Sequence, residues 1–159
     1  MSYFRHHVNH KVAISESSIS TQTLSTSTTQ DISNSTIAYT PHPLAKKVIY
    51  EGSIYMATTS RMFCAISLYH YTGGSWSEVN ENNRKEFHAN HYGYSASQEY
   101  TVYLRYVLDP WQGEKSLKMR VNNYTSASWN VRLHRTTRWE GSTSTDAYIM
   151  PQFMMYSVL

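Results

Sequence analysis

The feature that most constrains the fold is a regular alternation of apolar and polar residues in several short stretches of the chain. In residues 48–56 the even positions are Val, Tyr, Gly, Ile and Met, and the same period of two recurs in 62–68, 100–108, 117–121 and 129–133. Because successive side chains of a β-strand point to opposite faces, this period predicts strands with one face in a core. No stretch shows a convincing helical spacing.

Turn-forming residues separate these stretches. They are Thr72-Gly73-Gly74-Ser75, Asp109-Pro110-Trp111-Gln112-Gly113, Asn122-Asn123 and Glu140-Gly141-Ser142. The polar stretch 78–97 predicts a loop, with a strand near 86–89. Short strands joined by such turns predict an all-β fold, an antiparallel jelly roll or β-sandwich.

Composition divides the chain near Pro41. Between Ser15 and Thr36, 14 of 22 residues are Ser or Thr, which leaves too few apolar side chains to offset an ordering entropy of about 1 to 2 kcal/mol per residue. We therefore expect residues 1–40 to form an extended arm and residues 41–159 to form the β domain. The β-branched, glycine-free arm suits a chain that orders along a partner, and a solvated spacer is the alternative.

The apolar side chains of the arm are its expected contacts with that partner. They are Tyr3, Phe4, Val8, Val12, Ile14, Ile19, Leu24 and Ile32.

The last stretch of the chain, 147–159, breaks the alternation because apolar residues occupy both parities. One face of a strand in a two-layer sandwich contacts the core, so a second apolar face needs another cover. We expect a subunit interface here; a central strand covered by a loop of the same chain is the alternative. The expected interface residues are Tyr148, Met150, Phe153, Met154, Met155, Tyr156 and Val158.

Several functional classes find no support in the sequence. The net charge is only +3 and no dense basic run occurs, so nucleic acid is not an expected partner. No signal peptide or apolar run of membrane-spanning length is found, which predicts a soluble chain with no membrane partner. No catalytic or phosphate-binding motif occurs, so neither enzyme activity nor a cofactor is expected.

Three further groups of residues have side chains of the kinds found in functional sites. His6, His7 and His10 lack a nearby carboxylate or thiol, so a metal site is not expected there. Cys64 lies among apolar neighbours and predicts a buried, unreactive thiol. Trp76, Tyr92 and Tyr94 lie in or next to loops, where they are possible contacts for a sugar or a host surface.

The order of local features resembles a class of small virion proteins of tailed bacteriophages. The features are Tyr39-Thr40-Pro41 before Lys47-Val48-Ile49-Tyr50-Glu51, then Thr72-Gly73-Gly74-Ser75-Trp76-Ser77-Glu78, Leu104-Arg105-Tyr106-Val107-Leu108 before Trp111 and Gly113, and Trp139-Glu140-Gly141-Ser142. They cover residues 39–159, and the first 38 residues match nothing.

This resemblance implies a homotrimeric jelly roll on a virion that is assembled in the host cytoplasm. As a capsid decoration (cement) protein, it would contact the major capsid protein or another virion protein through the arm. As a tail fibre protein, it would touch a host surface glycan or receptor. A module that binds or hydrolyses carbohydrate is a third, less favoured class.

Overall fold

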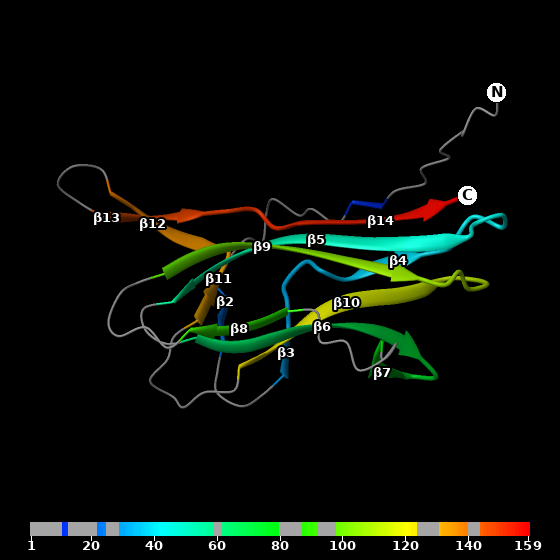
Figure 1. The fold of residues 1–159 in the computed structure, drawn as a ribbon, viewed down its shortest axis with the longest axis horizontal. Helices are drawn as coiled ribbons and strands as arrows, with labels where there is room; N and C mark the ends of the chain where they lie inside the picture. The colour runs from blue at the N-terminus through cyan, green and yellow to red at the C-terminus, as the bar shows by residue number, and fades with distance from the viewer. Residues whose placement is uncertain are drawn as a thin grey trace, which may run out of the picture.

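The structure is a computed structural model that describes residues 11–12, 22–24, 29–58, 62–79, 87–91, 98–123, 131–139 and 144–159. All regular secondary structure in these ranges is β-strand, and all strand pairs are antiparallel. Two sheets lie one above the other (Figure 1), so the predicted all-β sandwich is confirmed. The jelly-roll connectivity stays a prediction. These ranges contain no helix that is long and apolar enough to cross a membrane.

The first sheet, sheet A, is built around one long strand, β5. Its strands are β1 (Lys11–Val12), β2 (Gln22–Leu24), β5 (Lys47–Thr58), β9 (Gln98–Leu108), β11 (Val131–Leu133) and β14 (Gln152–Val158). One edge of β5 pairs with β9, and the other edge pairs first with β14 and then with β11. β5 therefore connects both flanks of the sheet.

The second sheet, sheet B, packs below it in Figure 1. Its strands are β3 (Thr29–Asp31), β4 (Ile37–Tyr39), β6 (Met62–Thr72), β7 (Ser75–Glu78), β8 (Phe87–His91) and β10 (Lys115–Asn123). β10 pairs with β6 on one edge and with β4 and β3 on the other. The strand expected near 86–89 is confirmed as β8.

A separate hairpin, formed by β12 (Arg135–Trp139) and β13 (Ser144–Tyr148), extends past the sandwich at the left of Figure 1. The first strand of the hairpin, β12, follows directly on β11.

His134 lies between β11 and β12 and has a left-handed backbone, with φ of 64°. His134 is 1 % exposed, and among the described residues neither ring nitrogen has a hydrogen-bond partner, so burial lowers the pKa of His134 to about 4.

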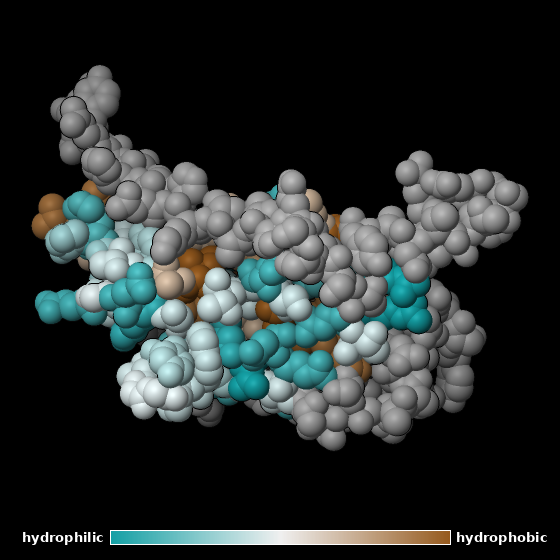
Figure 2. Space-filling model, turned by 180° about the vertical axis from the view of Figure 1, so that it is seen from behind, coloured by the Kyte–Doolittle hydropathy of each residue, from teal (hydrophilic) through white to brown (hydrophobic). Residues whose placement is uncertain are grey.

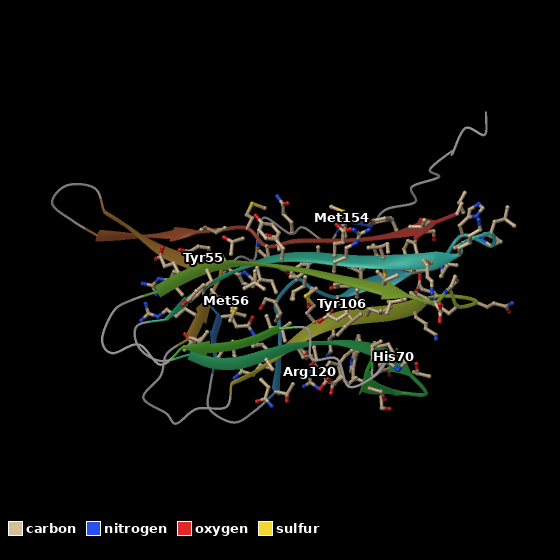
Figure 3. All side chains as sticks on the ribbon, viewed as in Figure 1. Tyr55, Met56, His70, Tyr106, Arg120 and Met154 are labelled. Carbon is tan, nitrogen blue, oxygen red and sulfur yellow. The ribbon has the colours of Figure 1, made fainter. Side chains whose placement is uncertain are left out.

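Alternate residues of the long strands form the core, as the period of two predicts. Tyr50, Ile54 and Met56 of β5 are fully buried, and Met56 and Tyr106 lie between the two layers in Figure 3. The Cys64 thiol also lies in this core, where burial raises its pKa to about 12. The prediction that the thiol is buried is confirmed.

The β6–β7 turn confirms one predicted turn, and β10 contradicts another. Gly73 and Gly74 have φ of 62° and 86°, the backbone that a tight two-residue hairpin requires and that favours glycine. Asn122 and Asn123 instead belong to β10 and pair with β6. The turn expected there is wrong, because the cross-strand register continues through both asparagines.

Part of the segment expected to be an arm belongs to the sandwich. Within residues 1–40, β2 pairs with β11, and β3 and β4 pair with β10. The side chains of Leu24 and Ile32 are 3 % and 2 % exposed in the core of the same chain. These two residues are therefore corrected from partner contacts to core residues, since the sheets of this chain supply the apolar cover that the segment lacks by itself.

The buried hydroxyl of Ser35 fixes the connection between β3 and β4 to the neighbouring strand β10. Ser35 Oγ donates to the Ile32 carbonyl at 2.7 Å, and the Met119 amide donates to Ser35 Oγ at 3.0 Å. The Tyr50 hydroxyl donates to the Ser35 carbonyl from sheet A. Ser35 thus satisfies backbone groups inside the fold, where an unpaired group would cost about 1 to 3 kcal/mol.

Close packing at Gly52 joins β5 to the neighbouring strand β14 and to the opposite sheet. A Cβ atom at Gly52 would lie 2.7 Å from Met119 Cε and 2.8 Å from Phe153 Cδ1. Phe153 is the direct cross-strand partner of Gly52, and its ring is fully buried. The missing side chain therefore provides the space that the Phe153 ring fills.

We predict that Gly52→Ala lowers the free energy of unfolding by about 1 to 3 kcal/mol, because the core has no space for the added methyl group. Urea unfolding of the purified protein measures this change. Ser53→Ala, one residue along the strand and half-buried on the opposite face, is the control and is expected to cost less than about 0.5 kcal/mol. The loss should shrink in a Phe153→Leu background, and an equal loss in both backgrounds contradicts the steric explanation.

Candidate assembly surface

The outer face of sheet A is formed by three neighbouring strands, β14, β5 and β9. Strand register places its residues in three rows across the sheet. The rows are Gln152, Ser53 and Tyr103; Met154, Glu51 and Arg105; and Tyr156, Ile49 and Val107. These nine residues define the outer face of sheet A, and Val158 continues it along β14.

Three large apolar side chains on this face are open to solvent, whereas Ile49 in its third row is buried. Tyr103 is 79 % exposed, Val107 is 51 % exposed and Met154 is 36 % exposed. Figure 3 shows Met154 on the side of β14 that faces away from sheet B. Such a group of exposed apolar residues on one sheet face is typical of a contact surface.

The face is also hollowed between its exposed side chains. A depression of about 370 Å³ lies between Tyr103, Arg105 and Met154, with Gly52 in its lining. The backbone of Gly52 contributes to this lining, since its missing side chain would point into the core. A shallow hollow rimmed by large side chains can accept a protruding side chain of a partner.

The only described carboxylate on this face, Glu51, is neutralised by its neighbours. Arg105 Nε lies 3.3 Å from Glu51 Oε1, and the Tyr156 hydroxyl donates to the same oxygen. Burial raises the pKa of Tyr156, and the hydrogen bond to Glu51 adds to this rise. A partner covering this face would therefore meet a paired charge, which costs less to desolvate than an unpaired one.

The expected interface residues of the closing strand divide between two faces. Phe153 and Met155 are fully buried in the core and are corrected from interface to core, because their parity points them at sheet B. Met154, Tyr156 and Val158 lie on the opposite face.

Two more of the expected interface residues lie just outside β14. Met150 is 36 % exposed. Tyr148 lies in β13, and its side chain is outside the described residues.

Sequence reasoning missed the contribution of β9 to this face. Tyr103 and Val107 alternate with the buried Val102, Leu104 and Tyr106. A signal was present, because two of the four positions between Tyr100 and Leu108 that should face solvent are large and apolar. The sequence alone does not show that β9 lies beside β5, so these two residues did not indicate an interface.

The remaining predicted contacts of the arm fall largely outside the described residues. Tyr3, Phe4, Val8, Ile14 and Ile19 lie there, and so do His6, His7 and His10 of the sequence analysis. For Val12 only the backbone is described, and it pairs with Met154 on the edge of β14 that faces away from β5. β1 therefore joins sheet A beside the outer face.

The outer face of sheet B contains Trp76, one of the expected surface contacts. Lys118 Nζ lies 3.9 Å from the centroid of the Trp76 ring, and the Tyr71 ring lies 5.3 Å away. Trp76 is thus half-buried in a contact within the chain, while Tyr71 is 45 % exposed. Tyr92 and Tyr94, the other two expected contacts, are outside the described residues.

Asp31 holds two cations of β10 next to these aromatic rings. Asp31 accepts from Lys118 at 2.6 Å and forms an ion pair with Arg120 at 2.8 Å. The Arg120 guanidinium also lies 4.8 Å from the centroid of the Tyr69 ring. Because the Lys118 side chain is only 8 % exposed, this cluster fixes β3 to β10 and has a structural role.

In the part of the chain that is described, no three His, Cys, Asp or Glu side chains are grouped closely enough to hold a metal ion. A scan against models of protein families and a search of curated proteins find no match to the chain. The outer face of sheet A and the resemblance noted from the sequence are therefore the grounds for assigning a function.

We predict that Asp31→Asn lowers the free energy of unfolding by about 2 kcal/mol, because it leaves the nearly buried Lys118 ammonium without its anion. Asp109→Asn is the matched control. It removes the ion pair between Asp109 and Lys47. Because the side chains of Lys47 and Asp109 are 49 % and 71 % exposed, the free energy of unfolding should fall by less than about 1 kcal/mol. Urea unfolding at neutral pH compares the two variants, and equal losses contradict the role of burial.

Proposed function

We propose that this chain is a non-enzymatic structural protein of a phage virion that assembles as a homotrimer through the outer face of sheet A. The main supporting observation is that two strands with exposed apolar side chains, β14 and β9, lie on either side of β5. Met154 of β14 and Tyr103 and Val107 of β9 flank the same strand. A second copy of the chain would cover these residues and fill the hollow between them.

On the head of the particle the trimer acts as a decoration, or cement, protein. The residues before β2 contact the major capsid protein or a neighbouring virion protein, with Tyr3, Phe4, Val8, Ile14 and Ile19 as the contacts. Permanent assemblies commonly bury 2,000 Å² or more in total. An extended segment can reach such an area without a large domain, which suits a chain of 159 residues.

A tail fibre protein that recognises the host is the second candidate. It is favoured by the exposed Tyr71 beside Trp76 on the outer face of sheet B. Aromatic side chains at the surface are suited to contact a glycan or a protein receptor.

We predict that Tyr103→Glu converts the trimer to a monomer, because three copies would bury unpaired carboxylates against apolar surface. Size-exclusion chromatography with light scattering measures the mass in solution. Tyr71→Glu is the matched control, since it changes an exposed tyrosine on the other sheet and should leave the trimer intact.

A wild-type protein that is monomeric at high concentration contradicts the assembly, and so does a Tyr103→Glu protein that remains trimeric. Thermal unfolding of each variant distinguishes dissociation from loss of the fold.

Electron microscopy of virions labelled with an antibody to the purified protein tests its location. Uniform labelling of heads supports the decoration protein, and labelling of tails supports the fibre protein. Virions without any label contradict both.

A further inference from the structure

A separate pocket opens between the two sheets at the end of the sandwich where β9 leads into β10. Its apolar floor is formed by Val79, Leu108 and Leu117, and its walls include His70, Asp109, Trp111 and Lys115. In Figure 3 His70 lies at this end of the lower layer, next to β7. None of these residues belongs to the outer face of sheet A.

The pocket has the size of a small-ligand site. Its volume is about 350 Å³, within the range of roughly 300 to 1,000 Å³ that is usual for such sites. An apolar floor with a few polar groups at the wall is also typical of them. The volume suits a single sugar ring better than an oligosaccharide.

The Trp111 ring is held in place before any ligand arrives. Its Nε1 donates to the Tyr39 carbonyl at 3.3 Å, and the two rings meet edge to face with centroids 6.4 Å apart. A fixed aromatic wall loses little conformational freedom on binding. The flat ring offers a surface against which the C–H face of a sugar can pack.

The polar groups of the wall favour an anion. Lys115 Nζ lies 5.5 Å from the centroid of the Trp111 ring, and no carboxylate in the described part of the chain forms an ion pair with it. The Asp109 carboxylate also lines the pocket, and it is paired with Lys47 at 2.5 Å. Lys115 therefore remains a pocket cation whose charge the lining carboxylate does not take up.

His70 adds a neutral hydrogen-bonding group to the same wall. Burial lowers the pKa of His70, and the charge of Lys115 lowers it further. Near neutral pH the imidazole is uncharged, so it can both donate to and accept from ligand hydroxyl groups.

We propose that this pocket binds a carboxylated monosaccharide of the hexuronic acid class. The carboxylate pairs with Lys115, the sugar ring packs on Trp111 above the apolar floor, and His70 hydrogen-bonds a ring hydroxyl. The inference does not depend on the trimer, because the pocket is built from one chain.

Titration of the full chain with glucuronate, followed by NMR, tests the site through the Trp111 indole N–H resonance, assigned with Trp111→Phe. A ligand of this size is expected to bind with a dissociation constant on the order of 1 mM. Glucose lacks the carboxylate and acetate lacks the ring, so each should bind at least about tenfold more weakly.

Two variants test the charge. Lys115→Met keeps the length of the side chain and should weaken glucuronate binding about tenfold, while Lys46→Met, outside the pocket, should leave it unchanged. The site is refuted by glucuronate that causes no shift at 20 mM, roughly twenty times the expected constant. It is also refuted by acetate or glucose that binds as well as glucuronate, or by Lys115→Met that binds like the wild type.

Discussion

The packing of the Phe153 ring into the space above Gly52 is the contact on which the arrangement of the two sheets depends. It fixes β14 to the central strand β5, and it brings Met119 of sheet B within contact distance of the same point. Close-packed interiors tolerate little change in volume. The spacing of the sheets and the register of the closing strand are thus set together, at one glycine.

The same register decides which side chains of the closing strand remain available to a partner. With Phe153 and Met155 directed inwards, Met154 and Tyr156 must lie on the outer face, because a strand has a period of two. Core and surface are therefore coupled along β14. The apolar outer face follows from the sequence of the strand once its inner face is filled.

The sequence predicted the long strands well, because each has one apolar parity that a half-buried strand explains. It could not predict which strands, distant in the sequence, pair with one another. Leu24 and Ile32 look like isolated apolar residues in a polar segment, and only the pairing of β2 with β11 and of β3 with β10 shows that they are core. His134 gave no local sign of the break between β11 and β12. Tyr103 and Lys115 became site residues only through contacts distant in sequence.

The buried thiol has a consequence for how copies of this chain can be joined. Cys64 is the single cysteine, it is fully enclosed, and its sulfur stays protonated at physiological pH. Disulfide exchange between copies is therefore closed to the folded protein. An oligomer of the folded protein is therefore held without disulfides, and local crowding of copies on a scaffold favours such an association by mass action.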